Sequence, residues 1–185
     1  MVQTSSPEMR EKLVLLLPKE EIAKAVCRLA EDIRTDYQGK SPLLVGVLKG
    51  AFMFLADLVR QIPPPLSVDF IRASSYGAST ETSGKVKVVH ALDSPVKGRD
   101  VLLVEDIVDT GLTTRFLLDY LSRKKPASLK LCALLDKRER RSRLAGPVQI
   151  DYLGFTVPNR FVVGYGIDVD QRYRNLPDIY YVLKE

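Results

Sequence analysis

Residues 101–114 have the sequence VLLVEDIVDTGLTT, in which an apolar run is followed by acidic residues and a loop rich in glycine and threonine. The apolar run is typical of a strand that is buried on both faces of a parallel sheet. Three carboxylates, Glu105, Asp106 and Asp109, gather where this strand ends, although the chain has a formal net charge of +5. Ligands of open parallel sheets bind beyond the carboxyl ends of the strands. The stretch therefore predicts a parallel sheet with a ligand site at one edge.

Apolar runs and helical patterns alternate along the rest of the chain. Strands are expected at residues 43–47, 68–74, 85–92, 100–106, 129–135, 150–157 and 161–168, and helices at residues 19–37, 51–62 and 113–124. This alternation predicts an α/β fold, with a mainly parallel twisted sheet flanked by helices. A length of 185 residues suggests one domain with at most a small appended lobe.

The composition argues against several classes of protein. The N-terminal apolar run Leu13–Leu17 is too short for a signal peptide, and no stretch is long and apolar enough to span a membrane, so we expect a cytoplasmic protein without a membrane partner. The two cysteines, Cys27 and Cys132, are expected to be buried free thiols. With His90 as the single histidine, the usual kind of zinc site cannot form. The positive net charge allows an anionic partner, which includes phosphorylated small molecules as well as nucleic acids.

The loop Asp109–Thr114 leads from the acidic strand end into a helix. Its backbone N–H groups, its hydroxyls and the helix dipole favour a phosphate, and Gly111 lets the backbone approach that ligand closely. The spacing differs from that of a Walker A loop. The neighbouring carboxylates could hold sugar hydroxyls, help to bind hydrated Mg²⁺ or accept a proton. The alternative is simple helix capping by Asp109 or Thr110, with Glu105 and Asp106 merely solvated.

The same stretch resembles the phosphoribosyl diphosphate (PRPP) binding motif of the type I phosphoribosyltransferases. The segments LVGVLKGAFMFLADL, VDFIRASSYG, LLDKRERR and FVVGYGIDVDQRYRNLP are similar to the hypoxanthine-guanine phosphoribosyltransferases. The resemblance implies the type I fold over residues 1–185 as a single domain, with a hood lobe from the N- and C-terminal segments. It also implies transfer of the 5-phosphoribosyl group of PRPP to a 6-oxopurine, hypoxanthine and/or guanine, in purine salvage. The products would be IMP or GMP and pyrophosphate, the cofactor would be Mg²⁺, and the assembly would be a homodimer or homotetramer.

The resemblance assigns one set of residues to PRPP and metal. Glu105 and Asp106 would hold the ribose hydroxyls, and together with Asp168 they would serve the metal. The 5′-phosphate would be wrapped by Thr110, Gly111, Leu112, Thr113 and Thr114, beside Asp109. Pyrophosphate would be bound by Lys49, Gly50 and Arg174. A cis peptide is implied between Leu48 and Lys49, where the ordinary interpretation is a turn with an exposed lysine.

The resemblance assigns a second set of residues to the purine and to a lid over the site. Asp109 would accept the N7 proton. The purine itself would be bound by Lys137, Phe161, Val162 and Asp168. Lys137 would donate to the 6-oxo group and Phe161 would stack on the ring, although most aromatic residues on strands belong to the core. We expect Arg138, Arg140, Arg141 and Arg143 to lie in a solvated loop. Residues 74–84 resemble a lid that begins with Ser75 and Tyr76, which would keep water from the reacting centre.

Two alternatives to this function stay open. The first is a regulator on the same fold that binds PRPP and RNA, which the basic composition permits. However, a PRPP sensor does not need the purine-site features, and no stripe of Arg and Lys interleaved with aromatic residues is found, so a nucleic-acid partner is not expected. The second is a phosphoribosyltransferase that prefers xanthine.

Overall fold

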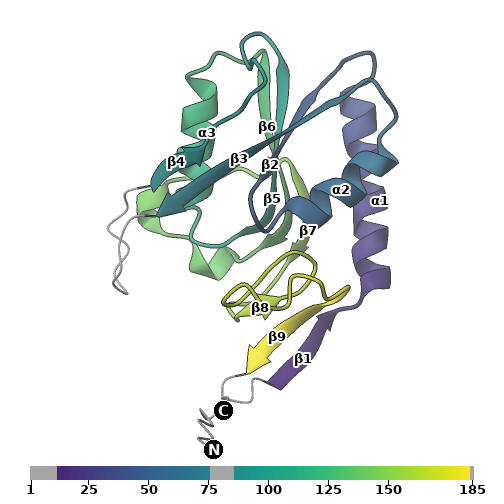
Figure 1. Cartoon of the computed structure of the whole chain (residues 1–185), viewed down its shortest axis with the longest axis vertical. Helices are drawn as coiled ribbons and strands as arrows, with labels where there is room; N and C mark the ends of the chain where they lie inside the picture. Colours follow the sequence, from purple (N-terminus) through teal and green to yellow (C-terminus); the bar gives the residue numbers. More distant parts are fainter. Residues whose placement is uncertain (1–11, 76–85, 184–185) are drawn as a thin grey trace, which may run out of the picture.

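The computed structural model describes residues 12–75 and 86–183, which form two sheets and three α-helices (Figure 1). The larger sheet has six strands in the order β4-β3-β2-β5-β6-β7. Their bounds are β2 Leu43–Val47, β3 Ser67–Ser75, β4 Val86–His90, β5 Asp100–Val108, β6 Ser128–Asp136 and β7 Tyr152–Thr156. All neighbouring strands pair in parallel except β3 and β4. The predicted α/β class with a mainly parallel sheet is therefore confirmed.

Helices cover both faces of this sheet. One core layer joins α1 (Lys19–Asp36) and α2 (Phe52–Gln61) to one face of the strands, and the other joins α3 (Leu112–Ser122) to the opposite face. Along β5, Leu102 and Val104 belong to the first layer, whereas Val101 and Leu103 belong to the second. Side chains of a strand point alternately to its two faces, so an unbroken apolar run satisfies both layers.

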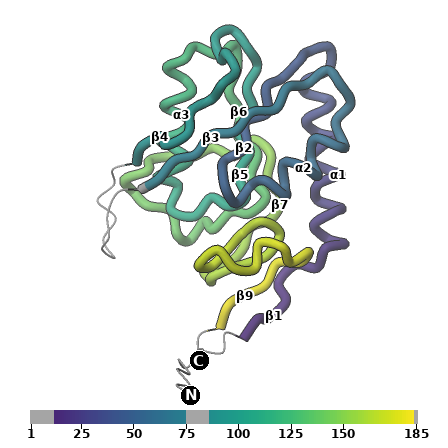
Figure 2. Tube along the Cα trace, viewed as in Figure 1, coloured from purple at the N-terminus to yellow at the C-terminus, as the bar shows by residue number. Residues whose placement is uncertain are grey.

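The smaller sheet joins the two ends of the described chain. Its order is β1-β9-β8, with β1 at Lys12–Leu17, β8 at Val162–Val163 and β9 at Ile179–Leu183. The strands β1 and β9 pair antiparallel with Lys12 opposite Leu183, and they run side by side in Figures 1 and 2. Neither β1 nor β9 was predicted from the sequence. Each is a short apolar run that forms a strand by pairing with a segment at the other end of the chain, and neither run by itself indicates that partner.

Two expectations are wrong. Residues 161–168 were expected to form one strand, but the strand ends at Val163 and the chain turns through Gly164, Tyr165 and Gly166, all with positive φ. A Cβ atom at Gly164 would overlap the carbonyl oxygen of Asp178, so only glycine fits this turn. Cys132 is buried as expected, but Cys27 is exposed on α1, because the side of this helix that faces the core is occupied by Ile22, Val26, Leu29 and Ile33.

The structure also bears on membrane insertion and on the expected lid. Within residues 12–75 and 86–183, no helix combines the length and the apolar character that crossing a bilayer requires. Ser75 is the last residue of β3. Tyr76 and most of the expected lid, residues 74–84, lie outside the described part of the chain.

Candidate active site

The acidic residues lie at the carboxyl end of β5, near the middle of the sheet. The strand continues to Val108, so Glu105 and Asp106 are part of it rather than of the following loop. Adjacent residues of a strand point to opposite faces, and the two carboxylates accordingly have different neighbours. Glu105 accepts a hydrogen bond from Oγ1 of Thr114 on the α3 side, at 2.7 Å. Asp106 lies against Gly50, where a Cβ atom would overlap its carboxylate.

Both carboxyl groups hold their protons more tightly than usual. Glu105 is buried, with 3% of its surface exposed, and its Oε1 atom has no hydrogen-bond partner. Burial raises the pKa of Glu105 to about 8, and Asp106 adds to the rise by repulsion. Burial also raises the pKa of Asp106 to about 6, against the opposing effect of two backbone N–H donors. An unsatisfied buried carboxyl oxygen is costly to keep, which indicates a site built for a polar ligand.

The raised pKa of Glu105 predicts a pH-dependent stability for the ligand-free protein. Between the ordinary pKa of 4.5 and the folded-state pKa of about 8, the folded protein retains a proton that the unfolded chain has released. Stability due to this group is therefore present below the unfolded pKa and falls as pH rises through that window. Over pH 6.5 to 8 the loss is about 2 kcal/mol, or roughly 5 °C in Tm.

The variant Glu105→Gln removes this titration and keeps an oxygen that can accept from Thr114. We expect its Tm to decline less than that of the wild type between pH 6.5 and 8. The control is Glu139→Gln, which changes an exposed acid of the 3₁₀-helix η1 (Arg138–Arg140). Melting curves of the three proteins without ligand would measure the difference. Parallel pH profiles for the wild type and Glu105→Gln would contradict the assignment.

The loop after β5 forms a small cavity at the N-terminus of α3. The cavity has a volume of about 200 Å³, and its lining residues include Glu105, Asp106, Asp109, Thr110, Gly111, Thr113 and Thr114. Gly111 occupies the N-cap position with φ of +79° and has no side chain to cap the helix. Glu105 is buried rather than solvated. Helix capping therefore does not explain the acidic residues, whereas an anion at this helix N-terminus is physically favourable.

The basic segment after β6 contacts this loop directly. Nζ of Lys137 lies 3.3 Å from one carboxylate oxygen of Asp109, and Nε of Arg140 lies 2.9 Å from the other. Arg141 donates to Asp136 at 2.6 Å, and its Nη1 atom is 3.5 Å from the carbonyl oxygen of Asp109. Arg140 keeps 45% of its side-chain surface exposed, as a solvated loop predicts, although it pairs with Asp109. The Arg141 side chain is only 22% exposed, so the prediction of a solvated loop is wrong for Arg141. Sequence reasoning missed both contacts because a run of arginines does not show which of them meets a carboxylate.

The remaining basic residues agree with the expectation more closely. Arg138 pairs with Asp136 at 3.4 Å but keeps 72% of its side-chain surface exposed, and Arg143 is exposed. The carboxylate of Asp136 is buried and contacts Arg141 from the other side. This buried pair connects the carboxyl end of β6 to the 109–111 loop.

Lys137 and Phe161 form an open platform beside Asp109. The Lys137 side chain is only 9% exposed, and its ammonium group lies 5.9 Å from the centre of the Phe161 ring. Phe161 is 57% exposed, so it does not belong to the core as most aromatic residues on strands do. Val162 is buried in β8, where it pairs with Tyr181 of β9. An exposed ring beside a buried cation can hold a flat ligand that carries an acceptor at its edge.

The residues expected to bind pyrophosphate lie between α2 and the turn that follows β8. The peptide bond between Leu48 and Lys49 is cis, as the resemblance implied. Gly166 packs against the carbonyl oxygen of Gly50 so closely that a Cβ atom would overlap it. Arg174 pairs with Asp168 at 2.7 Å and donates to the carbonyl oxygen of Gly166, also at 2.7 Å. The Nε atom of Arg174 is buried and has no partner.

One residue of this region was missed. Gln171 lies three positions after Asp168, and its side chain contacts Lys49, Asp168 and Arg174. It lies inside the quoted segment FVVGYGIDVDQRYRNLP, but no property of a single glutamine distinguishes it as part of a site.

The donor set fits a hydrated magnesium ion rather than a protein cage. Among the described residues, no group of three or more His, Cys, Asp or Glu side chains is arranged to hold a metal. Asp106 and Asp168 lie close enough for the charge of Asp168 to raise the pKa of Asp106. Mg²⁺ usually keeps several waters and binds through one or two carboxylates together with substrate phosphates. Asp106 and Asp168 match that pattern, whereas Glu105 points to the other face of β5, toward Thr114.

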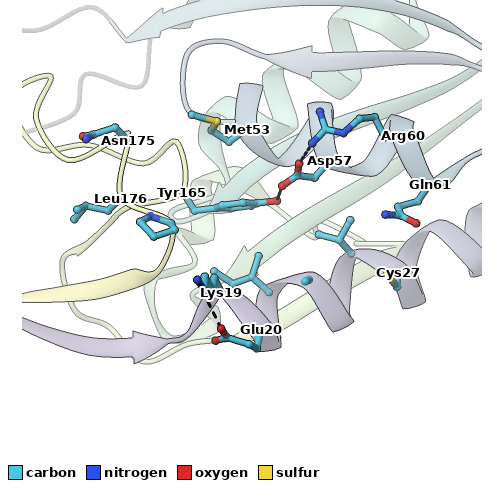
Figure 3. A pocket seen from close by; sticks show the side chains of 14 residues that line it. Lys19, Glu20, Cys27, Met53, Asp57, Arg60, Gln61, Tyr165, Asn175 and Leu176 are labelled. Atoms are coloured by element: carbon cyan, nitrogen blue, oxygen red, sulfur yellow. Dashed lines mark hydrogen bonds and ion pairs between the residues drawn. The ribbon is translucent and has the colours of Figure 1, made fainter.

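A second cavity, of about 660 Å³, lies between α1, α2 and the segment 165–177 (Figure 3). Its lining includes Met53, Asp57, Tyr165 and Leu176, and the hydroxyl of Tyr165 donates to Asp57. None of the residues that the resemblance assigns to PRPP, purine or metal lines it. The cavity at the end of β5 is smaller, but its lining includes the three carboxylates Glu105, Asp106 and Asp109.

Comparisons with known proteins agree with this geometry. The phosphoribosyl transferase domain family matches residues 16–170. A hypoxanthine-guanine phosphoribosyltransferase from Aquifex aeolicus is 48% identical over 173 residues, which cover 93% of this chain and 96% of that protein. A crystal structure of a hypoxanthine-guanine phosphoribosyltransferase from Bacillus anthracis is 46% identical with a TM-score of 0.86, covering 92% of this chain and 98% of that one. A hypoxanthine phosphoribosyltransferase structure from Staphylococcus aureus is 38% identical with a TM-score of 0.88, covering 98% and 97%.

Proposed function

The chain belongs to the family of hypoxanthine-guanine phosphoribosyltransferases, and we propose that it transfers the 5-phosphoribosyl group of PRPP to hypoxanthine or guanine. It is an enzyme of purine salvage, with PRPP and a purine base as substrates. The proposed products are IMP or GMP and pyrophosphate. The resemblance predicted from the sequence motifs is confirmed by the family match.

One contact supports the assignment of the two substrates to one centre. Nζ of Lys137 lies 3.3 Å from the carboxylate of Asp109, which places the donor beside the Phe161 platform next to the phosphate-binding loop. A purine held against Phe161 and Lys137 would therefore face the sugar of a PRPP molecule held by the 109–114 loop. A regulator that only senses PRPP needs no such platform, so the contact favours the transferase over the RNA-binding alternative.

We assign the following roles to the site residues. The backbone N–H groups at the start of α3, including that of Thr114, and the hydroxyls of Thr110 and Thr113 bind the 5′-phosphate. The hydroxyl of Thr114 donates to Glu105 instead. Asp106 and Glu105 lie beneath the ribose, where carboxyl oxygens accept from its hydroxyls. Asp109 accepts the proton from N7 of the purine as the bond to the sugar forms. The reacting carbon gains positive charge in the transition state, and nearby carboxylates stabilise that charge.

The pyrophosphate half of PRPP is assigned to the opposite wall of the site. Lys49, the backbone at Gly50 and Arg174 supply donors to its oxygens, and Asp168 holds Arg174 in place. Bound Mg²⁺ would supply charge neutralisation to the departing pyrophosphate, with Asp106 and Asp168 as its protein ligands. The tight packing of Gly166 on Gly50 keeps this wall rigid while the leaving group separates.

The metal proposal predicts complete dependence on a divalent cation. Activity should fall to background when EDTA is present in excess, because pyrophosphate is a poor leaving group when its charge is not neutralised. Activity should return in full when Mg²⁺ is added beyond the chelator. The measurement is nucleotide formation from hypoxanthine and PRPP, and a melting curve in EDTA serves as the control that the protein remains folded. Wild-type activity in EDTA would rule out the metal and the role of Asp168 with it.

The preference among oxopurines is tested by a steady-state assay with five bases and PRPP. We expect hypoxanthine and guanine to have the highest kcat/KM. A kcat/KM for xanthine above both would favour the xanthine-preferring alternative, and no turnover of any base would reject the enzyme proposal. A cytoplasmic location and a homodimer or homotetramer stay predictions that belong to the same proposal.

A further inference from the structure

We propose that Gln171 is a positioning residue for Lys49 and Arg174, the two cations assigned to pyrophosphate. It fixes where their side chains lie relative to Asp168. The inference rests on the proposed function, because it concerns the wall of the site that would bind the pyrophosphate group of PRPP. Gln171 itself touches neither the sugar nor the purine in this scheme. It acts through the side chains that do contact the substrate.

The side-chain amide of Gln171 connects three charged residues. Its oxygen accepts from Nζ of Lys49 at 3.0 Å and from Nη2 of Arg174 at 3.4 Å. Its nitrogen donates to Oδ2 of Asp168 at 3.3 Å. The cationic partners thus meet the acceptor end of the amide, and the anionic partner meets the donor end. A side-chain amide carries a donor end and an acceptor end at once, and glutamine places it further from the backbone than asparagine does.

The backbone conformation around Gln171 directs its side chain toward Asp168. Gln171 has φ of +63°, and Asp170 and Tyr173 also have positive φ. The backbone N–H of Gln171 donates to Oδ2 of Asp168 at 2.8 Å. Left-handed conformations are unfavourable for residues other than glycine, so they persist where the surrounding structure requires them. The turn thereby brings residue 171 back over residue 168.

A neutral connector has a chemical advantage at this position. Pyrophosphate is strongly anionic, and it needs the positive charge of Lys49 and Arg174. A carboxylate at position 171 would neutralise part of that charge and would also repel Asp168. The amide orders both cations without lowering their charge. Because Gln171 is exposed, we expect its replacement to change the stability of the fold little.

The experiment compares Gln171→Glu with Gln171→Met. Glutamate keeps the acceptor but adds charge and loses the donor, whereas methionine keeps the length and loses all hydrogen bonds. We expect KM for PRPP to rise roughly tenfold in Gln171→Glu and about threefold in Gln171→Met, while KM for hypoxanthine changes less than twofold. Calorimetric titration with magnesium pyrophosphate should show the same order of weakening in Kd. A purely structural role would raise both KM values together and lower Tm.

The matched control is Gln149→Glu, a second exposed glutamine whose amide donates to a carboxylate, Asp151, at 3.3 Å. Its kinetic constants should stay at wild-type values. The inference would be overturned if both Gln171 variants kept the pyrophosphate affinity and the KM for PRPP within twofold of wild type. It would also be overturned if KM for PRPP and KM for hypoxanthine rose by the same factor. Failure of the proposed function has a different signature: the wild type would form no nucleotide. The pyrophosphate titration would then still test whether Gln171 orders Lys49 and Arg174.

Discussion

Replacement of Asp109 by asparagine is expected to lower kcat by ~10²–10⁴-fold, the usual cost of removing a general base. Asparagine has almost the same shape as aspartate, but its amide cannot take the N7 proton from the purine. The affinity for PRPP should change little. In the proposed function the 5′-phosphate would be held by the loop backbone. This backbone is fixed independently by the hydrogen bond from the N–H of Ser142 to the carbonyl oxygen of Thr110 at 2.9 Å.

The structure adds a second consequence of this replacement. The carboxylate of Asp109 accepts from both Lys137 and Arg140. An asparagine can accept on one side only, and its NH₂ group would face a cation on the other. Arg140→Gln should therefore lower kcat less than Asp109→Asn does, because it removes one of the two donors to Asp109 and leaves the carboxylate that accepts the proton.

The measurement is steady-state turnover of guanine and hypoxanthine at saturating PRPP, with PRPP binding followed separately by calorimetry. The control is Asp119→Asn, because Asp119 also pairs with an arginine, Arg115, at 3.1 Å, but lies on the exposed face of α3. Its kcat should be that of the wild type. An Asp109→Asn enzyme that turned over as fast as the wild type would show that another group accepts the proton.

Replacement of Lys137 by glutamine is expected to narrow the discrimination between 6-oxopurines and adenine. A charged lysine has donors but no acceptor, and Lys137 is buried. In the proposed site a 6-oxo group would accept from this lysine, whereas a 6-amino group would present a second donor to it. A site built to hydrogen-bond one group can reject its analogue by roughly 10⁴-fold. The wild type should therefore use hypoxanthine and guanine and essentially ignore adenine.

Glutamine can present either a carbonyl or an N–H to the base, so the variant should lose most of its kcat/KM for hypoxanthine and guanine. PRPP binding should be almost unchanged, because the proposed function assigns the sugar phosphate to the 105–114 segment. The matched control is Lys130→Gln, which changes a lysine of β6, the strand that ends just before Lys137. Lys130 also pairs with an aspartate, Asp36, at 2.6 Å. This variant should keep the wild-type preference. A wild type that prefers adenine, or a Lys137→Gln enzyme with normal kcat/KM for both 6-oxopurines, would refute the assignment.

Much of the α/β architecture is predictable from local patterns. The run Val101–Val104 predicts a strand buried on both faces, and residues 19–37 predict a helix with one apolar side, as the structure shows at β5 and α1. Such patterns are informative because burial imposes a period of two on strands and about 3.6 on helices. The ligand loop was predictable for the same reason, since an acidic strand end and a glycine before a helix are local features.

The polar contacts of the site were not predictable in this way. Gln171 and Arg140 resemble many other surface residues in the sequence, and their partners Lys49 and Asp109 lie 122 and 31 positions away. A hydrogen bond depends on where two distant segments meet, and the periodicity of a segment says nothing about its partner.

The chain's own pattern of apolar and polar residues thus specifies a parallel sheet, the helices that cover it and a loop rich in glycine and threonine at the end of β5, because each follows from burial and turn chemistry within a few residues. The remaining features depend on the tertiary fold. It pairs β1 with β9, ends β8 at Val163, exposes Cys27 and brings Lys137 and Arg140 to Asp109. These outcomes depend on the packing of segments far apart in the chain, where the relative position of two backbones decides which side chains can touch.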